Sequence, residues 1–192
     1  FHAVKNLTTA EGGAITFSNT NSKNCDELYR WFRAMSLHGQ TKDAHAKLQP
    51  GAWEYDIIEP AFKCNMTDVA AAMGLVQLAR YPSLLARRRE IIGMYDRAFA
   101  GSAVLPLAHM GEDFCSSGHL YLTRIAGADE TARNRVIRQL AEQGIAANVH
   151  YKPLPMLSAY QKLGFAIKDF PNAYHLYENE LTLPLHTLLS DD

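Results

Sequence analysis

The sequence predicts an α/β fold, and three observations support this class. Short apolar runs such as 104–107 and 119–125 have the length and composition of strands, whereas 67–99 and 131–143 carry apolar residues at helical spacing. The two kinds of segment alternate along the chain, which is typical of α/β domains. The chain is 47% hydrophobic and 20% charged, so it has enough apolar material to build a core.

The first third of the chain predicts few regular elements. A Gly-Gly turn precedes an apolar run at 14–17, which indicates a buried strand. Asn24 or Asp26 can cap a helix with apolar residues at helical spacing, and Gly39 ends it. Residues 40–64 contain Pro and Gly breakers and are predicted to be irregular, and so long a stretch is typical of a functional or interfacial segment.

The middle of the chain predicts one long helix that begins at Asn65 or Thr67 and runs to Phe99. Pro82 is expected to break or kink this helix, because proline lacks the N–H of the helical hydrogen bond. The three arginines at 87–89 are expected to form a solvated helix face rather than an anion site.

The remainder of the chain predicts a small α/β unit, in which glycines and prolines separate apolar runs. The expected elements, in chain order, are strands at 104–107 and 119–125, a helix at 131–143, a strand at 145–151, a short helix at 157–163, a helix at 171–180 and a packing and turn segment at 181–186.

Charge, hydropathy and cysteine content argue against several classes of protein. Lys and Arg total 19 against 20 for Asp and Glu, so a net charge of −1 offers no general attraction for nucleic acid or an anionic membrane. No apolar run approaches the ~20 residues that span a bilayer. The three cysteines are widely spaced, which predicts a reducing, cytoplasmic compartment, and the eight histidines lack metal-ligand spacing, so no metal is expected.

The first sixteen residues, FHAVKNLTTAEGGAIT, contain the main candidate for chemistry. Lys5 follows a short apolar run and precedes a Glu-Gly-Gly turn, a setting in which partial desolvation favours the neutral amine. A neutral amine can attack an aldehyde and form a Schiff base. From composition and spacing alone, a solvated surface lysine remains the alternative.

The FH, KN and EGG groups at this spacing resemble the Schiff-base segment of the DegT/DnrJ/EryC1/StrS family, whose members are pyridoxal 5'-phosphate (PLP) sugar aminotransferases. The resemblance implies that Lys5 is the catalytic residue, that it binds PLP covalently, and that it then moves a proton between donor and cofactor. His2 and Asn6 are expected to face away from Lys5 in an extended segment. Gly12 and Gly13 are expected to serve backbone shape.

The resemblance covers nearly the whole chain and matches the C-terminal half of a family member. It implies the PLP-dependent transferase fold of the aspartate aminotransferase type, in truncated form. Residues 1–60 would be a remnant of the large PLP-binding domain, 61–102 the long connecting helix region, and 103–192 the small C-terminal α/β domain.

The stretch AFKCNMTD at 61–68 resembles a family segment whose side chains cross the dimer interface toward the partner's cofactor phosphate. Asn65 is the implied cofactor-binding residue here, because an amide N–H near a helix N-terminus suits a phosphate oxygen. An N-cap role for Asn65 is the structural alternative. Phe62 and Cys64 replace the usual tyrosines. The implied assembly is a homodimer with shared active sites.

Two further stretches, HLY at 119–121 and HYKPL at 150–154, resemble small-domain segments of the family, and the second lies near the sugar-nucleotide pocket of its members. They imply substrate-binding roles for His119, His150 and Tyr151, since histidine and tyrosine can donate to a diphosphate or to a sugar hydroxyl. A packed strand histidine is the alternative for His119.

The implied function is PLP-dependent transamination of a nucleotide-linked keto-sugar by an amino-acid donor, expected to be glutamate, in amino-sugar or cell-surface polysaccharide biosynthesis. Two alternatives stay open. A related PLP-dependent sugar dehydratase would carry histidine in place of Lys5, so the lysine argues against it. A catalytically incompetent fragment that serves dimerisation is the second alternative.

Overall fold

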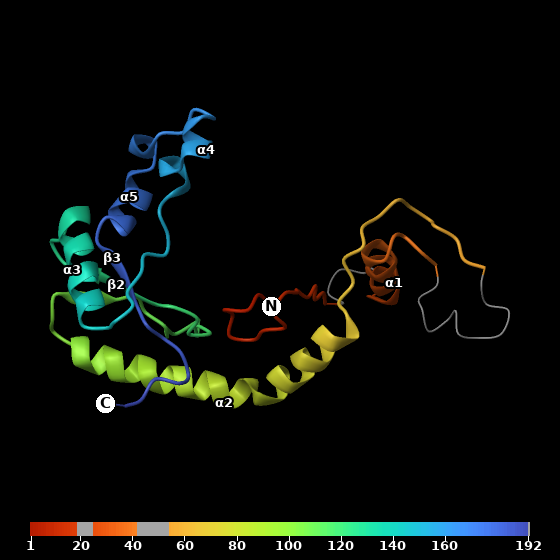
Figure 1. The fold of residues 1–192 in the computed structure, drawn as a ribbon, viewed down its shortest axis with the longest axis horizontal. Coiled ribbons are helices and arrows are strands. Elements are labelled where there is room, and N and C mark those ends of the chain that lie inside the picture. Colours follow the sequence, from red (N-terminus) through yellow and green to blue (C-terminus); the bar gives the residue numbers. More distant parts are fainter. Residues whose placement is uncertain (19–24, 42–53, 192) are drawn as a thin grey trace. The chain divides into compact units, whose positions relative to one another are not determined.

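The computed structural model describes residues 1–18, 25–41 and 54–191, and it divides into two compact units, Phe1–Ala79 and Arg80–Asp192. Figure 1 follows the chain through the helices and strands of both units. The boundary falls inside the longest helix, which therefore contributes residues to both. The three-part division expected at 1–60, 61–102 and 103–192 concerns the complete family fold and stays a prediction.

Helix α1 (Cys25–Ser36) is the main element of the first unit and confirms the helix expected there. Two acidic residues in its first turn and Arg33 in its last turn complement the helix dipole. Gly39 follows the helix with φ 73°, a conformation that glycine adopts without steric cost. The suggested cap Asn24 lies outside the described residues.

The chain returns along the end of α1 through main-chain hydrogen bonds. His38 donates to the carbonyl of Phe62 at 2.8 Å, and Cys64 donates to the carbonyl of Ser36 at 2.8 Å. The described parts of 40–64 are irregular as predicted, apart from isolated bridges. These bonds fix the segment that leads into the next helix.

Helix α2 (Asp68–Phe99) is the long helix expected from the sequence. The hydroxyl of Thr67 accepts a hydrogen bond from the amide of Ala70 at 3.3 Å, so Thr67 caps its first turn. The helix continues through Pro82, and the predicted break does not occur.

The expectation that no apolar run approaches the length of a membrane span is wrong, because α2 is apolar enough to cross a membrane by length and composition alone. Core helices of soluble proteins satisfy the same test. Ile91 and Ile92 of this helix are buried within the second unit. Arg88 donates to the carbonyls of Gly118 and Leu185, each at 3.0 Å. These contacts hold the C-terminal part of α2 in the second unit.

Three short strands form the sheet of the second unit, β1 (Val104–Pro106), β2 (Tyr121–Ile125) and β3 (Glu180–Leu183). The sheet is antiparallel, with β2 in the centre. Tyr121 and Thr123 are almost completely buried and lie on one face of β2, because successive side chains of a strand point to opposite sides.

Helix α3 (Glu130–Glu142) packs beside this sheet (Figure 1). The carboxylate of Asp129 caps it by accepting from the amide of Ala132 at 2.7 Å. Arg133 is 1% exposed; it lies over the ring of Tyr177 and donates to the carbonyl of Glu180 at 3.2 Å. The remaining elements are short helices: η3 (Leu154–Met156), α4 (Ser158–Gln161), η4 (Ile167–Asp169) and α5 (Pro171–Tyr177).

Several predicted elements are wrong or displaced. Residues 14–17 form no strand, and Ile15 is 66% exposed rather than buried. Residues 145–151 make a single bridge, between Asn148 and Thr182, because the amide of His150 donates to the side chain of Glu180 instead of to the main chain of β3. The helix expected at 171–180 ends at Tyr177. The segment 181–186, predicted to form packing and turn structure, contains residues 181–183 of strand β3.

Candidate functional site

Lys5 lies in a tight turn rather than in an extended segment. Its amide donates to the carbonyl of His2 at 2.9 Å, which closes the turn. The expectation that His2 and Asn6 face away from Lys5 by strand alternation is therefore wrong. The side chain of Lys5 is exposed, so the expected partial desolvation of its amine is not observed here.

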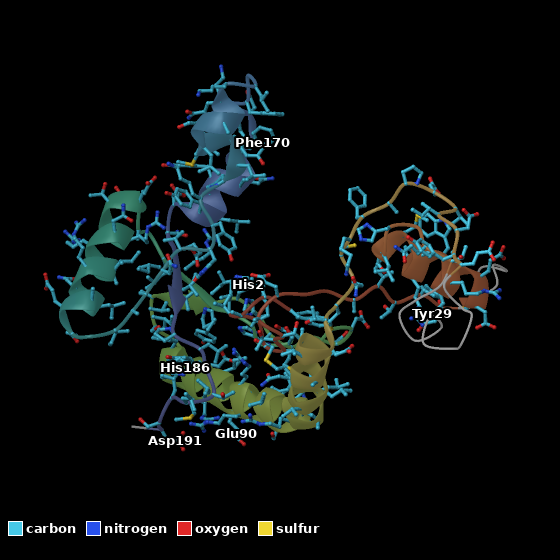
Figure 2. The ribbon with its side chains drawn as sticks, turned by 45° about the vertical axis from the view of Figure 1, so that its right-hand side comes forward. His2, Tyr29, Glu90, Phe170, His186 and Asp191 are labelled. Carbon is cyan, nitrogen blue, oxygen red and sulfur yellow. The ribbon has the colours of Figure 1, made fainter. Side chains whose placement is uncertain are left out.

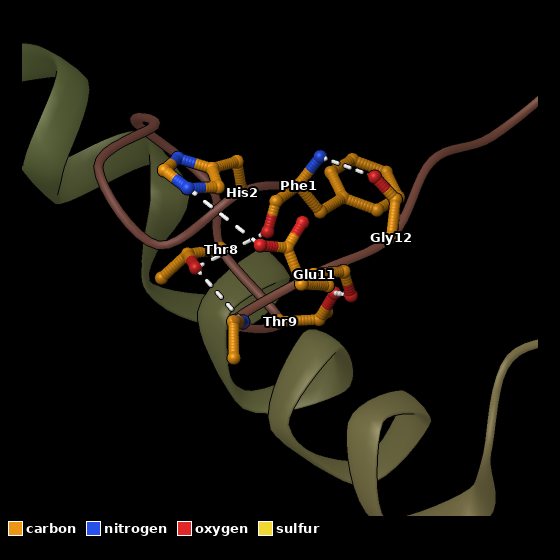
Figure 3. Close-up of polar contacts among 7 residues, drawn as sticks. Phe1, His2, Thr8, Thr9, Glu11 and Gly12 are labelled. Atoms are coloured by element: carbon orange, nitrogen blue, oxygen red, sulfur yellow. Dashed lines mark hydrogen bonds and ion pairs between the residues drawn. The ribbon is translucent and has the colours of Figure 1, made fainter.

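The Lys5 turn belongs to a loop, residues 1–12, whose ends are joined by hydrogen bonds (Figure 3). The amide of Thr9 donates to the carbonyl of Phe1 at 3.0 Å, and the hydroxyl of Thr8 donates to the same carbonyl at 3.3 Å. Thr9 is buried, and its hydroxyl donates to the carbonyl of Glu11 at 2.6 Å. The closed ends leave Lys5 on the exposed part of the loop.

The same loop packs against the beginning of α2. A Cβ added at Gly12 would lie 2.7 Å from the hydroxyl oxygen of Thr9 and 2.9 Å from Cε of Met66, and φ of Gly12 is +148°. A Cβ at Gly74 would lie 3.0 Å from Cγ2 of Thr9. Gly12 is therefore required for backbone shape and close packing, which brings the Lys5 loop beside Met66.

Asn65 directly precedes Met66, and its side chain is exposed. Its Oδ1 accepts a hydrogen bond from the ammonium of Lys63, and its Nδ2 donates to the carbonyl of Met66 at 3.4 Å. Because Thr67 caps α2, the alternative that Asn65 is the N-cap is wrong. Lys63 is a cation that the sequence analysis missed; its position two residues before Asn65 in a non-helical stretch is the signal that could have identified it.

The donor set of the first unit fits PLP. Lys5 offers an exposed primary amine for the cofactor's aldehyde, and Asn65 and Lys63 offer an amide N–H and an ammonium, which suit phosphate oxygens. Gly12 supplies the small residue that lets the loop approach the segment carrying these donors.

In the second unit, His150 and Tyr151 line a cavity of about 520 Å³ between the sheet and α5. Their rings meet edge to face, with centroids 4.7 Å apart. The lining is mostly apolar, and its charged groups are Arg124 and Glu180. The structure thus places two of the three predicted substrate residues at one cavity.

Two residues of β3 contact His150 and were missed by the sequence analysis. Oε2 of Glu180 accepts from the amide of His150 at 2.9 Å, and Oγ1 of Thr182 lies 2.9 Å from Nδ1 of His150. Glu180 and Thr182 are two residues apart, so in a strand their side chains lie on the same face. The sequence could have indicated this pair only if 180–183 had been predicted to be a strand.

His119 is not part of this cavity. It lines a separate cavity of about 230 Å³ together with His109 and Ser116. His109 is 8% exposed, its Nδ1 lies 3.2 Å from Oγ of Ser116, and its Nε2 has no hydrogen-bond partner among the described residues. Burial lowers the pKa of His109, and the charge of Asp96 opposes this shift in part.

Within the described ranges, no cluster of three or more His, Cys, Asp or Glu residues is arranged to hold a metal ion. The described cysteines, Cys25, Cys64 and Cys115, form no disulfide with one another.

Comparison with known proteins agrees with these features. The model of the DegT/DnrJ/EryC1/StrS aminotransferase family matches residues 1–192. The spore coat polysaccharide biosynthesis protein SpsC of Bacillus subtilis (strain 168) is 37% identical over 199 residues, which cover 100% of this chain and 49% of SpsC.

Solved structures give the same result. Spr1654 of Streptococcus pneumoniae, described as a sugar aminotransferase, matches in its PMP-form with 60% identity and a TM-score of 0.93, over 100% of this chain and 48% of that chain. Its PLP-form matches with a TM-score of 0.91. PseC of Helicobacter pylori, an aminotransferase involved in the biosynthesis of pseudoaminic acid, is 30% identical with a TM-score of 0.80, over 100% of this chain and 48% of PseC.

The expected cofactor, PLP, is confirmed by the PLP-form of this solved relative. The expected truncated α/β fold is also confirmed. The chain spans about half the length of these relatives. Since the family model covers every residue from 1 to 192, the chain belongs to the DegT/DnrJ/EryC1/StrS aminotransferase family.

Proposed function

We propose that this chain serves in a PLP-dependent sugar aminotransferase, which transfers an amino group from glutamate to a nucleotide-linked keto-sugar for cell-surface polysaccharide biosynthesis. The observation that carries the proposal is the Lys5 loop, which is closed at its ends and packed beside Met66 at the start of α2. The names of SpsC and PseC, with their roles in polysaccharide and pseudoaminic acid biosynthesis, support the substrate class. The proposed location is the cytoplasm.

Each residue of the first unit has a proposed part. When bound, PLP supplies an electron sink for the carbon from which a proton is removed. Lys5 would attach to the cofactor through Nζ and, once released, would hold the migrating proton at Nζ, where tethering makes the transfer effectively intramolecular. Asn65 and Lys63 would bind phosphate oxygens.

A homodimer with shared sites is the proposed assembly. Phe62 is 79% exposed, and several apolar side chains in the first turns of α2 are also exposed, which is typical of a surface that another element covers. This group comprises Val69, Leu75, Val76 and Leu78.

The cavity of the second unit is the proposed site for part of the sugar substrate. Its volume of about 520 Å³ lies within the range of small-molecule sites, and His150 and Tyr151 supply polar groups at its wall. His119 lines another cavity, so a substrate contact for this residue is proposed only for a part of the ligand beyond the His150 cavity.

The decisive experiment tests Lys5 in the intact protein. Borohydride reduction after incubation with PLP, followed by peptide mapping, should place a pyridoxyl group on Lys5. Lys5→Ala should abolish turnover of glutamate, because it removes the amine proposed to attach to the cofactor and to carry the proton. Lys162→Ala, which removes another exposed lysine, is the matched control and should keep both the label on Lys5 and the activity. Labelling of a different lysine would refute the assignment.

The same experiment addresses the dehydratase alternative. A dehydratase would release water from a nucleotide sugar without consuming glutamate, so loss of water from the sugar without 2-oxoglutarate formation would favour it. A protein that neither takes up label nor turns over glutamate would favour the fragment that serves dimerisation.

A further inference from the structure

Glu180, Thr182 and His150 form a hydrogen-bonded chain in the second unit. The hydroxyl of Thr182 donates to Oε1 of Glu180 at 2.5 Å, and Nδ1 of His150 lies 2.9 Å from the same hydroxyl oxygen. Oε2 of Glu180 accepts from the amide of His150 at 2.9 Å. Glu180 and Thr182 are 7% and 4% exposed, so water has little access to either.

Counting hydrogens assigns the direction of each bond. An ionised carboxylate can only accept, and a threonine hydroxyl has one hydrogen to donate. Because that hydrogen lies on the bond to Glu180, the oxygen of Thr182 can only accept from His150. We infer that Thr182 and Glu180 are positioning residues that hold the neutral imidazole of His150 as the Nδ1–H tautomer, with Nε2 as its acceptor atom.

Main-chain hydrogen bonds between Asn148 and Thr182 support this arrangement. Asn148 donates to the carbonyl of Thr182 at 3.0 Å, and the amide of Thr182 donates back to the carbonyl of Asn148 at 2.8 Å. This pair sets the register two residues before His150. The bond from the His150 amide to Glu180 then holds the backbone of the histidine itself. The imidazole is therefore presented in one orientation, as a ligand-binding group must be.

The tautomer determines what His150 can bind, and this step rests on the proposed function. A neutral imidazole with its hydrogen on Nδ1 accepts at Nε2, so it pairs with a donor such as a sugar hydroxyl. A phosphate oxygen only accepts, so it cannot pair with this nitrogen. Of the charged groups at the cavity, Arg124 is the one whose charge suits an anion; its Nε donates to Asn179 and its Nη2 contacts His175. Glu180 is an acceptor engaged by His150 and Thr182. We therefore assign a sugar hydroxyl, rather than the diphosphate, as the partner of His150.

The tautomer can be read by ¹⁵N NMR of the histidine rings in the intact protein at a pH where imidazole is neutral. The wild type should show His150 protonated at Nδ1, and Thr182→Ser, which keeps the hydroxyl, should show the same. Thr123→Val is the matched control, because it removes another buried hydroxyl, one that donates to the carbonyl of Leu181, and should leave His150 unchanged.

Glu180→Gln gives the sharpest outcome. Its carbonyl oxygen can still accept from the His150 amide, but its NH₂ group then donates to Thr182, which frees the hydroxyl hydrogen to donate to Nδ1 of His150. The tautomer should therefore invert to Nε2–H. A wild-type Nε2–H signal, or a Glu180→Gln spectrum like that of the wild type, overturns the inference. If Glu180→Gln fails to fold, Thr182→Val provides the same test by lowering the Nδ1–H population.

Kinetics separate this inference from the proposed function. Inverting the tautomer turns Nε2 of His150 from an acceptor into a donor, so the sugar hydroxyl must reverse its hydrogen bond and give up its own donor role there. Glu180→Gln should therefore raise the KM for the sugar substrate by about two- to tenfold, with little change in the glutamate half-reaction. Thr182→Ser keeps the hydroxyl, so its KM for the sugar substrate should stay close to that of the wild type. A protein without aminotransferase activity would refute the proposed function but leave the NMR result valid. Unchanged KM values with an inverted tautomer would refute the hydroxyl assignment.

Discussion

The hydroxyl of Tyr121 donates a hydrogen bond of 2.7 Å to Oδ1 of Asp96, which joins the central strand of the sheet to α2. Tyr121 is fully buried, and its ring makes stacked contacts with the rings of Tyr95 and His109. Burial and the bond to Asp96 raise the pKa of Tyr121 well above its usual value, so the phenol stays protonated and remains a donor.

Tyr121→Phe should lower the free energy of unfolding by about 1–2 kcal/mol, because the exposed Asp96 can recover water while the helix loses its link to β2. Urea denaturation measures this change. Tyr160→Phe removes a hydroxyl at a half-buried position away from this contact and should change stability by less than about 0.5 kcal/mol. Equal stability of Tyr121→Phe and the wild type would contradict the proposed link.

Stability should fall on mild acidification because of His109. Its pKa in the folded state is lowered below 6.5 by burial, whereas the unfolded chain takes up a proton near that value. As the pH falls below 6.5, the unfolded state gains a proton that folded His109 resists, so the free energy of unfolding decreases until the folded pKa is reached. Denaturation between pH 7.5 and 5 should show a weaker pH dependence for His109→Gln than for the wild type. The same slope in both would exclude His109 as the source.

Arg88 and Arg89 should differ sharply despite being neighbours. Arg88 donates to main-chain carbonyls of Gly118 and Leu185, and burial lowers its pKa, whereas Arg89 is exposed and contacts the thiol of Cys115. Arg88→Met leaves these carbonyls without their donor and should cost about 2–3 kcal/mol of stability. Arg89→Met, the matched control, should cost less than about 0.5 kcal/mol. Similar costs for both would show that the carbonyl contacts contribute little.

Gly39→Ala should disrupt the first unit. A Cβ at this position would lie 1.8 Å from the carbonyl oxygen of Glu59, and φ is +73°. Gly101 has φ +72° with nothing within 4 Å of an added Cβ, so Gly101→Ala measures the conformational cost alone, about 1–2 kcal/mol. The amide of Ile58 donates to the carbonyl of Gly39, and its hydrogen exchange should accelerate in Gly39→Ala but not in Gly101→Ala. Unchanged protection of Ile58 would contradict the predicted clash.

Subunit mixing should decide whether Asn65 serves its own site or that of the partner. If Asn65 acts across a dimer interface, mixing Lys5→Ala subunits with Asn65→Ala subunits creates one intact site per heterodimer, and activity should recover to a fraction of the wild type. Because Met66 packs beside the Lys5 loop of its own chain, the alternative is action within one subunit, in which case no intact site forms. Absence of recovery in confirmed heterodimers would therefore refute the shared site.

Local sequence patterns were sufficient where a single segment contains all the interactions that decide its structure. The apolar spacing of 67–99 and of 131–143 predicted two helices with nearly correct ends. The spacing of FH, KN and EGG around Lys5 likewise identified the family without any structural information. Helix periodicity and capping depend on residues a few positions apart, so they can be read from one stretch of chain.

The contacts of the arginines at 87–89 could not be predicted from local sequence patterns. The run was expected to be one solvated face, but Arg87 pairs with Asp191 and Glu90, the two acidic residues labelled in Figure 2. Arg88 instead binds carbonyls of residues 118 and 185. Helical spacing determines that the three side chains point in different directions. Which of them meets a distant carbonyl depends on how α2 packs, and that information is absent from the local sequence.

The candidate sites divide in the same way. The sequence alone identified Lys5, Asn65, His150 and Tyr151 as residue types suited to a cofactor and a sugar, and it placed them in chain order. Only the tertiary structure revealed that Thr182 and Glu180, some thirty residues away, meet His150, and that residues 145–151 leave the sheet after one bridge. The physical reason is that strand pairing and hydrogen direction are settled by partners distant in sequence, so a single hydroxyl hydrogen on Thr182 determines which nitrogen of His150 can accept.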